Sequence, residues 1–406
     1  MKRFLLILAA VWPLVVSAAE LLPMDLCRGS RRPYPAPESV EAVPDSLSVV
    51  MISHVGRHGA RYATSPGRFT DVVDLLQAHH EKLTPKGKRL LEITLDAIEQ
   101  TDGRWGALDS LGRAEQQGIA TRLCNAFPQL VVGQKVTAIS SVTPRCVHSM
   151  EAFCSVVRRF QSGLGSVSQS SGEQYSPLMR PFAVDSAYIE WAEEKPYARV
   201  YDPYMRRLTP RQLVGRLIKD AELSDKQTEE FCASAYYVVS TLACMSSPDA
   251  DEGMELLTPR EQNDLWEIDN LRQYLSRTAT TVSTLPADIA RPLLNDIVQG
   301  IDDFIAGRTD VTLQLRFGHA ETLMPLLSLM RLPGCYYLTY YWDTVEKHWD
   351  TWHVVPMAAN LQLILLKSHS TGNYYVRIDL NERPIALGTE TYLSWPRLRH
   401  LFQAFL

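Results

Sequence analysis

Two arginines and a histidine are crowded into five residues of the segment MISHVGRHGARYATSP, which spans residues 51–66. Arg57 and Arg61 flank His58, and positive groups this close repel one another unless an anion lies between them. Guanidinium groups grip phosphate oxygens in pairs, and an imidazole attacks phosphorus through one ring nitrogen when its other N–H is held. The segment therefore suggests a phosphate site with a histidine nucleophile, although a short Arg/His run by itself is more commonly solvated surface.

Two later segments present ionisable residues at equivalent places. The runs KVTAIS (135–140) and VTLQLRF (311–317) have the pattern of strands, and a helix-like pattern follows each of them. The first turn presents Arg145, and the second presents His319 and Glu321. Taken singly, His319 is more commonly a hydrogen-bonded structural histidine, and Glu321 an acid that stabilises the start of a helix. Their joint occurrence at three strand-to-helix junctions favours a chemical role.

The three junctions predict an α/β fold with a mostly parallel sheet flanked by helices. A first strand is expected in LSVVMISH (47–54), and a helix with Pro66 at its first position follows the Arg/His loop. Open sheets of this kind bind ligands at the carboxyl ends of their strands, where helix N-termini add N–H groups suited to a phosphate. We therefore expect Arg57, His58 and Arg61 to meet the residues of the other two junctions at one edge.

The chain of 406 residues is expected to hold a leader and two domains. Residues 1–19 have Lys2 and Arg3, an apolar core and small residues at the end, which is the pattern of a secretory signal peptide. Residues 20–160 and 305–406 are predicted to form the α/β domain, and residues 161–304 a mostly α-helical cap domain inserted into it. The stretch 163–174 is expected to be a surface loop or hinge, and CYYLTYYW, NLQLILLKS and NYYVRIDLNERPI are expected to be strands that complete the sheet.

Charge and cysteine content restrict the partners. Removing residues 1–19 takes the formal net charge from −5 to −7, which disfavours nucleic acid or an anionic membrane as a partner. The seven cysteines are an odd number without a CxxC pair, so a zinc knuckle is not expected. We expect an exported, periplasmic or secreted monomer that uses no cofactor. A metal centre built from His54, His58 and His319 is an alternative that the adjacent arginines disfavour, because they would repel the cation.

The residues carry a resemblance to a known family. RHGAR (57–61), TPRCVHSMEAF (143–153) and FGHAETL (317–323) resemble motifs of the histidine phosphatase superfamily in its acid phosphatase and phytase branch. The distal His-Ala-Glu resembles the multiple inositol polyphosphate phosphatases more narrowly. The resemblance implies a metal-free phosphohistidine mechanism in which His58 is the nucleophile and Glu321 the proton donor. It assigns the phosphate pocket to Arg57, Arg61, Arg145 and His319.

The same resemblance implies inositol hexakisphosphate and lower inositol phosphates as substrates. A broad-specificity acid phosphatase, a sugar phosphatase, and a phosphate-binding protein without turnover remain alternatives. The chain departs from the family pattern at Ala63, where relatives often have proline, and at Tyr204, where a family stretch has cysteine. Basic residues early in the predicted cap are candidates for holding the other phosphates, and solvated surface is the alternative for each: Arg180, Lys195 and Arg199.

Overall fold

One mixed sheet organises the molecule. The computed structural model describes residues 21–163 and 165–406, so the predicted signal peptide lies outside the described residues. The strands follow one another across the sheet in the order β3-β2-β4-β1-β5-β6-β7, and β8 pairs with β6. The half from β3 to β1 is parallel, and β5 to β8 are joined antiparallel. The strands are β1 (Leu47–Arg57), β2 (Lys135–Ser140), β3 (Ser166–Ser171), β4 (Val311–Gly318), β5 (Asn360–Ser368), β6 (Tyr374–Leu380), β7 (Arg383–Ile385) and β8 (Leu393–Ser394).

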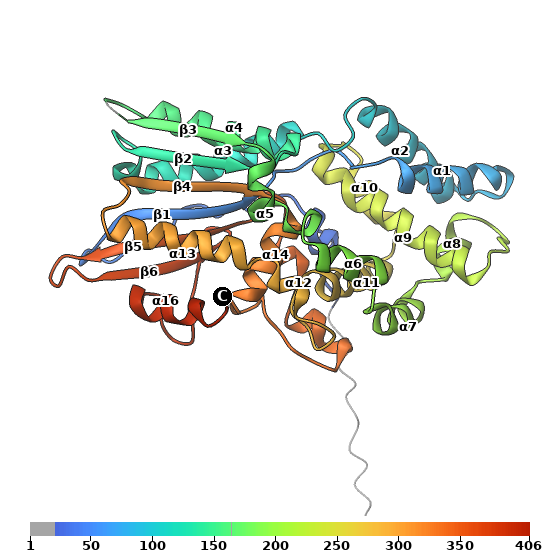
Figure 1. The fold of residues 1–406 in the computed structure, drawn as a ribbon. Helices are drawn as coiled ribbons and strands as arrows, with labels where there is room; N and C mark the ends of the chain where they lie inside the picture. Colours follow the sequence, from blue (N-terminus) through green and yellow to red (C-terminus); the bar gives the residue numbers. More distant parts are fainter. Residues whose placement is uncertain (1–20, 164) are drawn as a thin grey trace, which may run out of the picture.

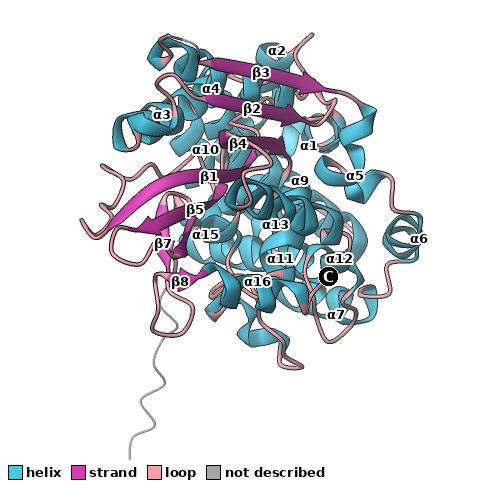
Figure 2. Ribbon diagram, turned by 60° about the vertical axis from the view of Figure 1, so that its left-hand side comes forward, coloured by secondary structure: helices cyan, strands magenta, loops and turns pink. Residues whose placement is uncertain are grey.

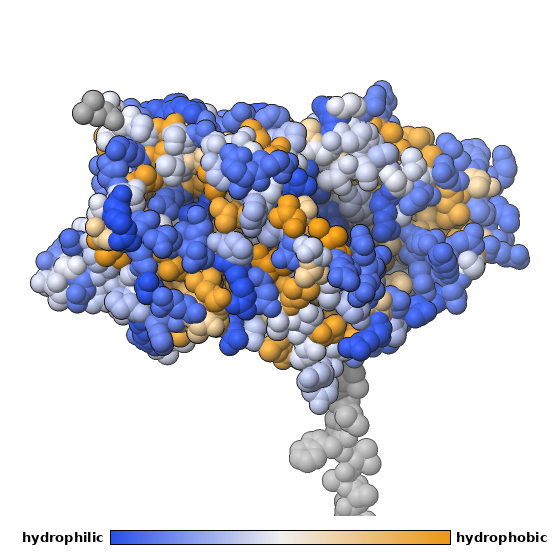
Figure 3. Space-filling view, viewed as in Figure 1, coloured by the Kyte–Doolittle hydropathy of each residue, from blue (hydrophilic) through white to orange (hydrophobic). Residues whose placement is uncertain are grey.

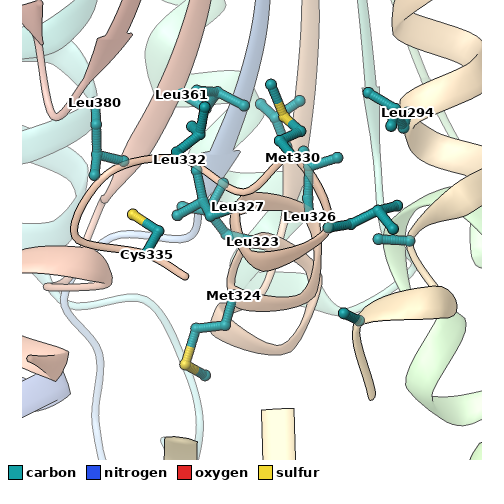
Figure 4. Packing of buried hydrophobic residues seen from close by; sticks show 14 of the residues in the cluster. Leu294, Leu323, Met324, Leu326, Leu327, Met330, Leu332, Cys335, Leu361 and Leu380 are labelled. Carbon is teal, nitrogen blue, oxygen red and sulfur yellow. The ribbon is translucent and has the colours of Figure 1, made fainter. Parts of the chain in front are cut away.

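Helices cover both faces of this sheet (Figure 1). On one face, α3 (Ser110–Ala126) and α4 (Pro144–Phe160) pack against residues such as Ile52 and Phe317. On the other face lie α13 (Arg291–Ile305), α14 (Ala320–Leu329) and α16 (Trp395–Gln403), where Met51 and Leu363 join the core. Figure 4 shows the apolar side chains of α14 packed between the strands and Leu294 of α13. The predicted α/β class is confirmed.

A second body of helices lies beyond the carboxyl ends of β1 and β4 (Figures 1 and 2). Its own apolar core joins α1, α2, α8, α9 and α11 and contains Phe69, Leu90, Leu213, Phe231 and Trp266. The helices here are α1 (Gly67–Ala78), α2 (Pro85–Thr101), α6 (Ser186–Glu194), α7 (Ala198–Leu208), α8 (Gln212–Leu217), α9 (Asp225–Thr241), α10 (Ala250–Glu255) and α11 (Pro259–Arg277). Three short helices instead place Met179, Ala287 and Val354 in the apolar core that α14 shares with the sheet: α5 (Ser176–Met179), α12 (Leu285–Asp288) and α15 (Thr351–Val354).

Local sequence signals account for where several of these helices begin. Ser224 with Gln227 and Thr258 with Glu261 form capping boxes, in which the side chain of each residue accepts from the backbone N–H of its partner.

Two expectations about secondary structure fail. Residues 163–174 are not only a loop or hinge, because Ser166–Ser171 form β3 beside β2. The segment CYYLTYYW forms no strand and instead runs as irregular chain into a 3₁₀ turn at Trp342–Lys347.

The two-domain division at residues 161–304 stays a prediction, and several elements cross it. β3 and α13 fall inside that range but belong to the sheet and its helical cover. Conversely, α1 and α2 fall outside it but pack against α9 and α8. No helix among the described residues is long and apolar enough to cross a membrane.

Candidate active site

The loop after β1 is held against two other elements. The backbone N–H of His58 donates to Gly318 at the end of β4, and the carbonyl of His58 accepts from Ala358. Gly59 lies directly against Gly112 of α3, where a Cβ atom on either glycine would overlap backbone atoms of the other loop or helix. Only glycine allows this approach, so the loop after β1 lies directly against α3.

His58 has the geometry of a neutral nucleophile. It is buried, and its Nδ1 lies 2.9 Å from the carbonyl oxygen of Gly59, which can only accept, so the proton sits on Nδ1. Burial lowers the pKa of His58 well below its usual value, and the nearby Arg145 lowers it further. Nε2 therefore keeps its lone pair at ordinary pH and is the ring nitrogen available for attack.

Three arginines surround His58, and each has a guanidinium nitrogen that makes no hydrogen bond among the described residues. Arg57 donates from Nη1 to the carbonyls of Ser30 (2.7 Å) and Val355 (2.5 Å), which fixes its direction. Burial and then Arg61 lower the pKa of Arg57 to about 10, so it stays charged. The Nε atoms of Arg57, Arg61 and Arg145 are buried without a hydrogen-bond partner among the described residues. Buried donors of this kind fit an anion that supplies the missing acceptors.

His319 is buried beside this group of arginines. Its Nε2 lies 2.9 Å from Ser141 Oγ, and its Nδ1 lies 3.3 Å from Arg145 Nη2, which can only donate. Nδ1 therefore accepts in the empty site, and burial lowers the pKa of His319 to about 3. Its predicted role as a donor to phosphate requires Arg145 to turn to the substrate and Nδ1 to gain a proton.

Glu321 stands in the first turn of α14 and faces Arg277. Its Oε1 lies 3.3 Å from Arg277 Nη2. Burial raises the pKa of Glu321, but Arg277 and His319 outweigh that effect and leave it at about 2. Beside these positive groups Glu321 is a carboxylate, and it must receive a proton before it can act as an acid.

All of these side chains except His319 line a cavity of about 210 Å³, which shares lining residues with a larger cavity of about 710 Å³ between α7, α9 and α11. Figure 3 shows the surface hollowed between the sheet and the helical body. Arg31, Tyr237 and Arg272 line both cavities. The smaller one collects six arginines against the single carboxylate of Glu321: Arg31, Arg57, Arg61, Arg145, Arg272 and Arg277.

The predicted residues divide into two groups. Arg57, His58, Arg61, Arg145 and Glu321 line the smaller cavity, and His319 lies behind it with its ring 5.8 Å from that of His58. The three specificity candidates are not brought there. Arg180 lies close enough to act on His319 and Arg145 but does not line either cavity. Lys195 and Arg199 are exposed and line neither of these two cavities, so their role in holding further phosphates stays a prediction.

Sequence reasoning missed the arginines that lie opposite His58. Asp269 bonds Arg272 (2.7 Å) and Arg31 (3.2 Å), and the guanidinium of Arg31 also lies over the rings of Tyr236 and Tyr237. A signal was present in α11, where polar residues recur on the buried face that an amphipathic helix normally keeps apolar.

All seven cysteines are buried thiols in the described structure. Burial raises the pKa of Cys146, which touches His319, to about 12. The same holds for Cys244, whose thiol donates to the carbonyl of Arg31. Neither is a thiolate at ordinary pH, which leaves His58 and Glu321 as the candidates for nucleophile and acid.

Comparisons with known proteins agree with the geometry. Residues 191–381 match the model of the histidine phosphatase superfamily (branch 2), a range that includes Glu321 but not the loop at 57–61. The multiple inositol polyphosphate phosphatase 1 of Gallus gallus is 23% identical over 393 residues, covering 90% of this chain and 83% of that protein. The Homo sapiens protein of the same name is 24% identical over 422 residues, covering 94% and 84%.

A solved structure shares the fold. The multiple inositol polyphosphate phosphatase of Bifidobacterium longum in complex with inositol hexasulfate aligns with a TM-score of 0.76 at 16% identity. The alignment covers 92% of this chain and 97% of that one. The whole arrangement of sheet and helical body is therefore shared with that enzyme.

Proposed function

The chain carries a histidine phosphatase domain of branch 2 and is a phosphoric monoester hydrolase, and on that premise we propose that it hydrolyses inositol hexakisphosphate and lower inositol phosphates. The observation that carries the substrate class is the excess of arginine in the cleft. Six guanidinium groups line the smaller cavity with Glu321, and even with Asp269 bonded to Arg31 and Arg272 the positive charge exceeds what a single phosphate needs. Three of them stand away from His58, on the side where the remaining phosphates of a polyphosphorylated ring would lie.

The proposed reaction has two steps through a phosphohistidine. His58 Nε2 attacks phosphorus while Arg57, Arg61 and Arg145 bind the non-bridging oxygens, and the bond to the leaving oxygen breaks as Glu321 gives that oxygen its proton. Glu321 then takes a proton from water, whose oxygen attacks phosphorus. The N–P bond breaks, and inorganic phosphate leaves.

Substrate binding explains how Glu321 obtains its proton. In the empty site Arg277 and His319 keep the carboxylate ionised. A phosphate between the arginines cancels much of that positive charge and brings its own negative charge close to Glu321, which raises the pKa of Glu321. The acid therefore forms where and when the leaving oxygen needs it.

Export to the periplasm or outside the cell belongs to the same proposal. It rests on the pattern of residues 1–19 alone. Monomeric action without a metal or other cofactor is likewise proposed, since His58 and Glu321 supply both the nucleophile and the acid.

Substituting Arg272→Ala tests the substrate class. Arg272 lines both cavities but stands apart from the loop that holds His58. We expect KM for inositol hexakisphosphate to rise about tenfold, as the loss of a charge-assisted contact implies, while KM for p-nitrophenyl phosphate stays within twofold. Steady-state release of inorganic phosphate from both substrates measures this.

The exposed Arg199→Ala variant is the matched control, because it removes an arginine that lines neither cavity. Equal losses on both substrates in Arg272→Ala would contradict a role in holding further phosphates. Trapping the wild-type phosphoenzyme by alkaline quench, which preserves the acid-labile N–P bond, tests the intermediate separately, with His58→Ala as the negative control. Unaltered turnover in His58→Ala would overturn the mechanism.

A further inference from the structure

A buried carboxylate of α3 grips the peptide unit that holds the nucleophile. Glu115 accepts at Oε2 from the N–H of Ala60 (2.7 Å) and at Oε1 from the N–H of Tyr34 (2.8 Å). The N–H of Ala60 and the carbonyl of Gly59 belong to one peptide unit, which is planar and points them in opposite directions. The same carbonyl accepts from His58 Nδ1. Glu115 and His58 therefore bind opposite ends of a single peptide plane.

We propose that Glu115 is a positioning residue for His58, acting through the Gly59–Ala60 peptide. It fixes the plane of that peptide, and so the direction of the carbonyl that keeps the proton on Nδ1 and Nε2 facing the substrate. This rests on His58 being the nucleophile of the proposed function. The arrangement does for His58 what a carboxylate bonded directly to a catalytic histidine does, with a peptide interposed.

Burial raises the pKa of Glu115 to about 7, so the carboxylate is ionised above that pH, where its negative charge has a second consequence. A carboxylate bonded to the N–H of a peptide polarises that peptide and makes its carbonyl a stronger acceptor. When Nε2 bonds to phosphorus the imidazole ring becomes cationic, and its Nδ1–H then binds the Gly59 oxygen more tightly. Glu115 thus stabilises the state that develops during attack more than the resting state. No proton moves along this chain, and no bond to Glu115 forms or breaks.

Neighbouring contacts leave the peptide little freedom to find another orientation. The N–H of Gly59 donates to Ser149 Oγ (3.1 Å), and the carbonyl of Ala60 accepts from the N–H of Asp109 (3.0 Å). Gln116, the next residue of α3, donates from Nε2 to the carbonyl of Arg57 (2.9 Å). The start of α3, together with Ser149 of α4, therefore fixes the loop from Arg57 to Ala60. Among these hydrogen-bond partners, Glu115 is the only one that bonds the Gly59–Ala60 peptide through a carboxylate.

The test substitutes Glu115→Gln, which keeps the size of the side chain and removes its charge. The expected result is a fall in kcat of about ten- to one-hundredfold, the usual loss when a group that orients a catalytic residue is removed, with KM for p-nitrophenyl phosphate unchanged. The burst of phosphoenzyme after alkaline quench, measured above pH 7 where Glu115 is ionised, should slow by the same factor. Glu115→Asp, which keeps the charge but is one methylene shorter, replaces Glu115→Gln if that variant does not fold. For Glu115→Asp we expect a smaller fall in kcat, again with KM unchanged.

Glu261→Gln is the matched control. Glu261 is also buried and also accepts a backbone N–H, that of Thr258 at 2.7 Å, but it does so at the start of α11. A thermal melt shows which variants fold. A kcat within twofold of wild type in a folded Glu115 variant would overturn the proposal, as would an equal loss in Glu261→Gln. Absence of a phosphoenzyme in the wild type would instead contradict the proposed function and, with it, the nucleophile that Glu115 is said to position.

Discussion

His54 of β1 is a buried histidine that the chemistry does not use. Its ring lies between Phe153 and Phe317, and neither ring nitrogen has a hydrogen-bond partner among the described residues. Burial, helped by the charge of Arg316, lowers the pKa of His54 to about 3. The unfolded chain would bind a proton here below pH 6.5, whereas the folded chain binds it only below about pH 3.

The sign of the effect on stability follows directly. The stability that neutral His54 contributes is fully present above pH 6.5 and is lost as pH falls towards 3. At pH 4 the loss in the free energy of unfolding amounts to about 3 kcal/mol. We predict that His54→Phe lessens the fall in the free energy of unfolding between pH 7 and pH 4 by about this amount. Urea denaturation at both pH values measures it. Burial raises the pKa values of Glu115 and Asp350 to about 7, and these groups change stability with pH in the opposite sense. Because both groups are present in variant and wild type, the difference between the two proteins isolates His54. An unaltered pH dependence would contradict the assignment.

At the scale of elements, the loop that holds His58 packs against α3 through one close approach, between Gly112 and the backbone of Gly59 and Ala60. A Cβ on Gly112 would overlap backbone atoms of Ala60 and Gly59. Alanine normally stabilises a helix by about 1 kcal/mol relative to glycine, but here we predict that Gly112→Ala destabilises by about 3 kcal/mol and lowers kcat, because the loop must move. Gly118→Ala in the same helix is the control, since its Cβ would meet only the end of the flexible Arg122 side chain. Chemical denaturation and p-nitrophenyl phosphate turnover give both readouts; a Gly112→Ala protein as stable as Gly118→Ala would refute the argument.

The same elements show what the sequence could predict. The strands that lead to Arg57, Arg145 and His319 could be predicted because apolar, β-branched runs end there at turn residues. Parallel pairing of these strands then brings their carboxyl ends together. The role of Glu115 was not readable, since it depends on a backbone N–H that its side chain meets only after folding. Lys195 and Arg199 are exposed outside the two cavities, because sequence proximity to the cap does not fix which helix face meets the cleft. Arg272 and Arg31, which do meet it, are 241 positions apart in the chain and are joined only by Asp269.

At the scale of the whole molecule, an acidic protein surrounds a basic cleft. The formal net charge is −5, yet six arginines line the smaller cavity with one carboxylate. A field of this shape draws in an anion in proportion to the anion's charge, and salt screens the attraction over a Debye length of about 10 Å at 0.1 M.

We therefore predict that raising potassium chloride from about 0.02 M to about 0.2 M lowers kcat/KM for inositol hexakisphosphate about tenfold, and for p-nitrophenyl phosphate no more than about threefold. The monoester is the internal control, because any effect of salt on folding or on the phosphate pocket acts on both substrates alike. Phosphate-free buffer is needed, since inorganic phosphate would occupy the pocket. Arg272→Ala should lessen the salt dependence for the hexakisphosphate and leave that for the monoester unchanged. Parallel salt dependences for the two substrates in the wild type would mean that the cleft does not hold phosphates beyond the one being cleaved.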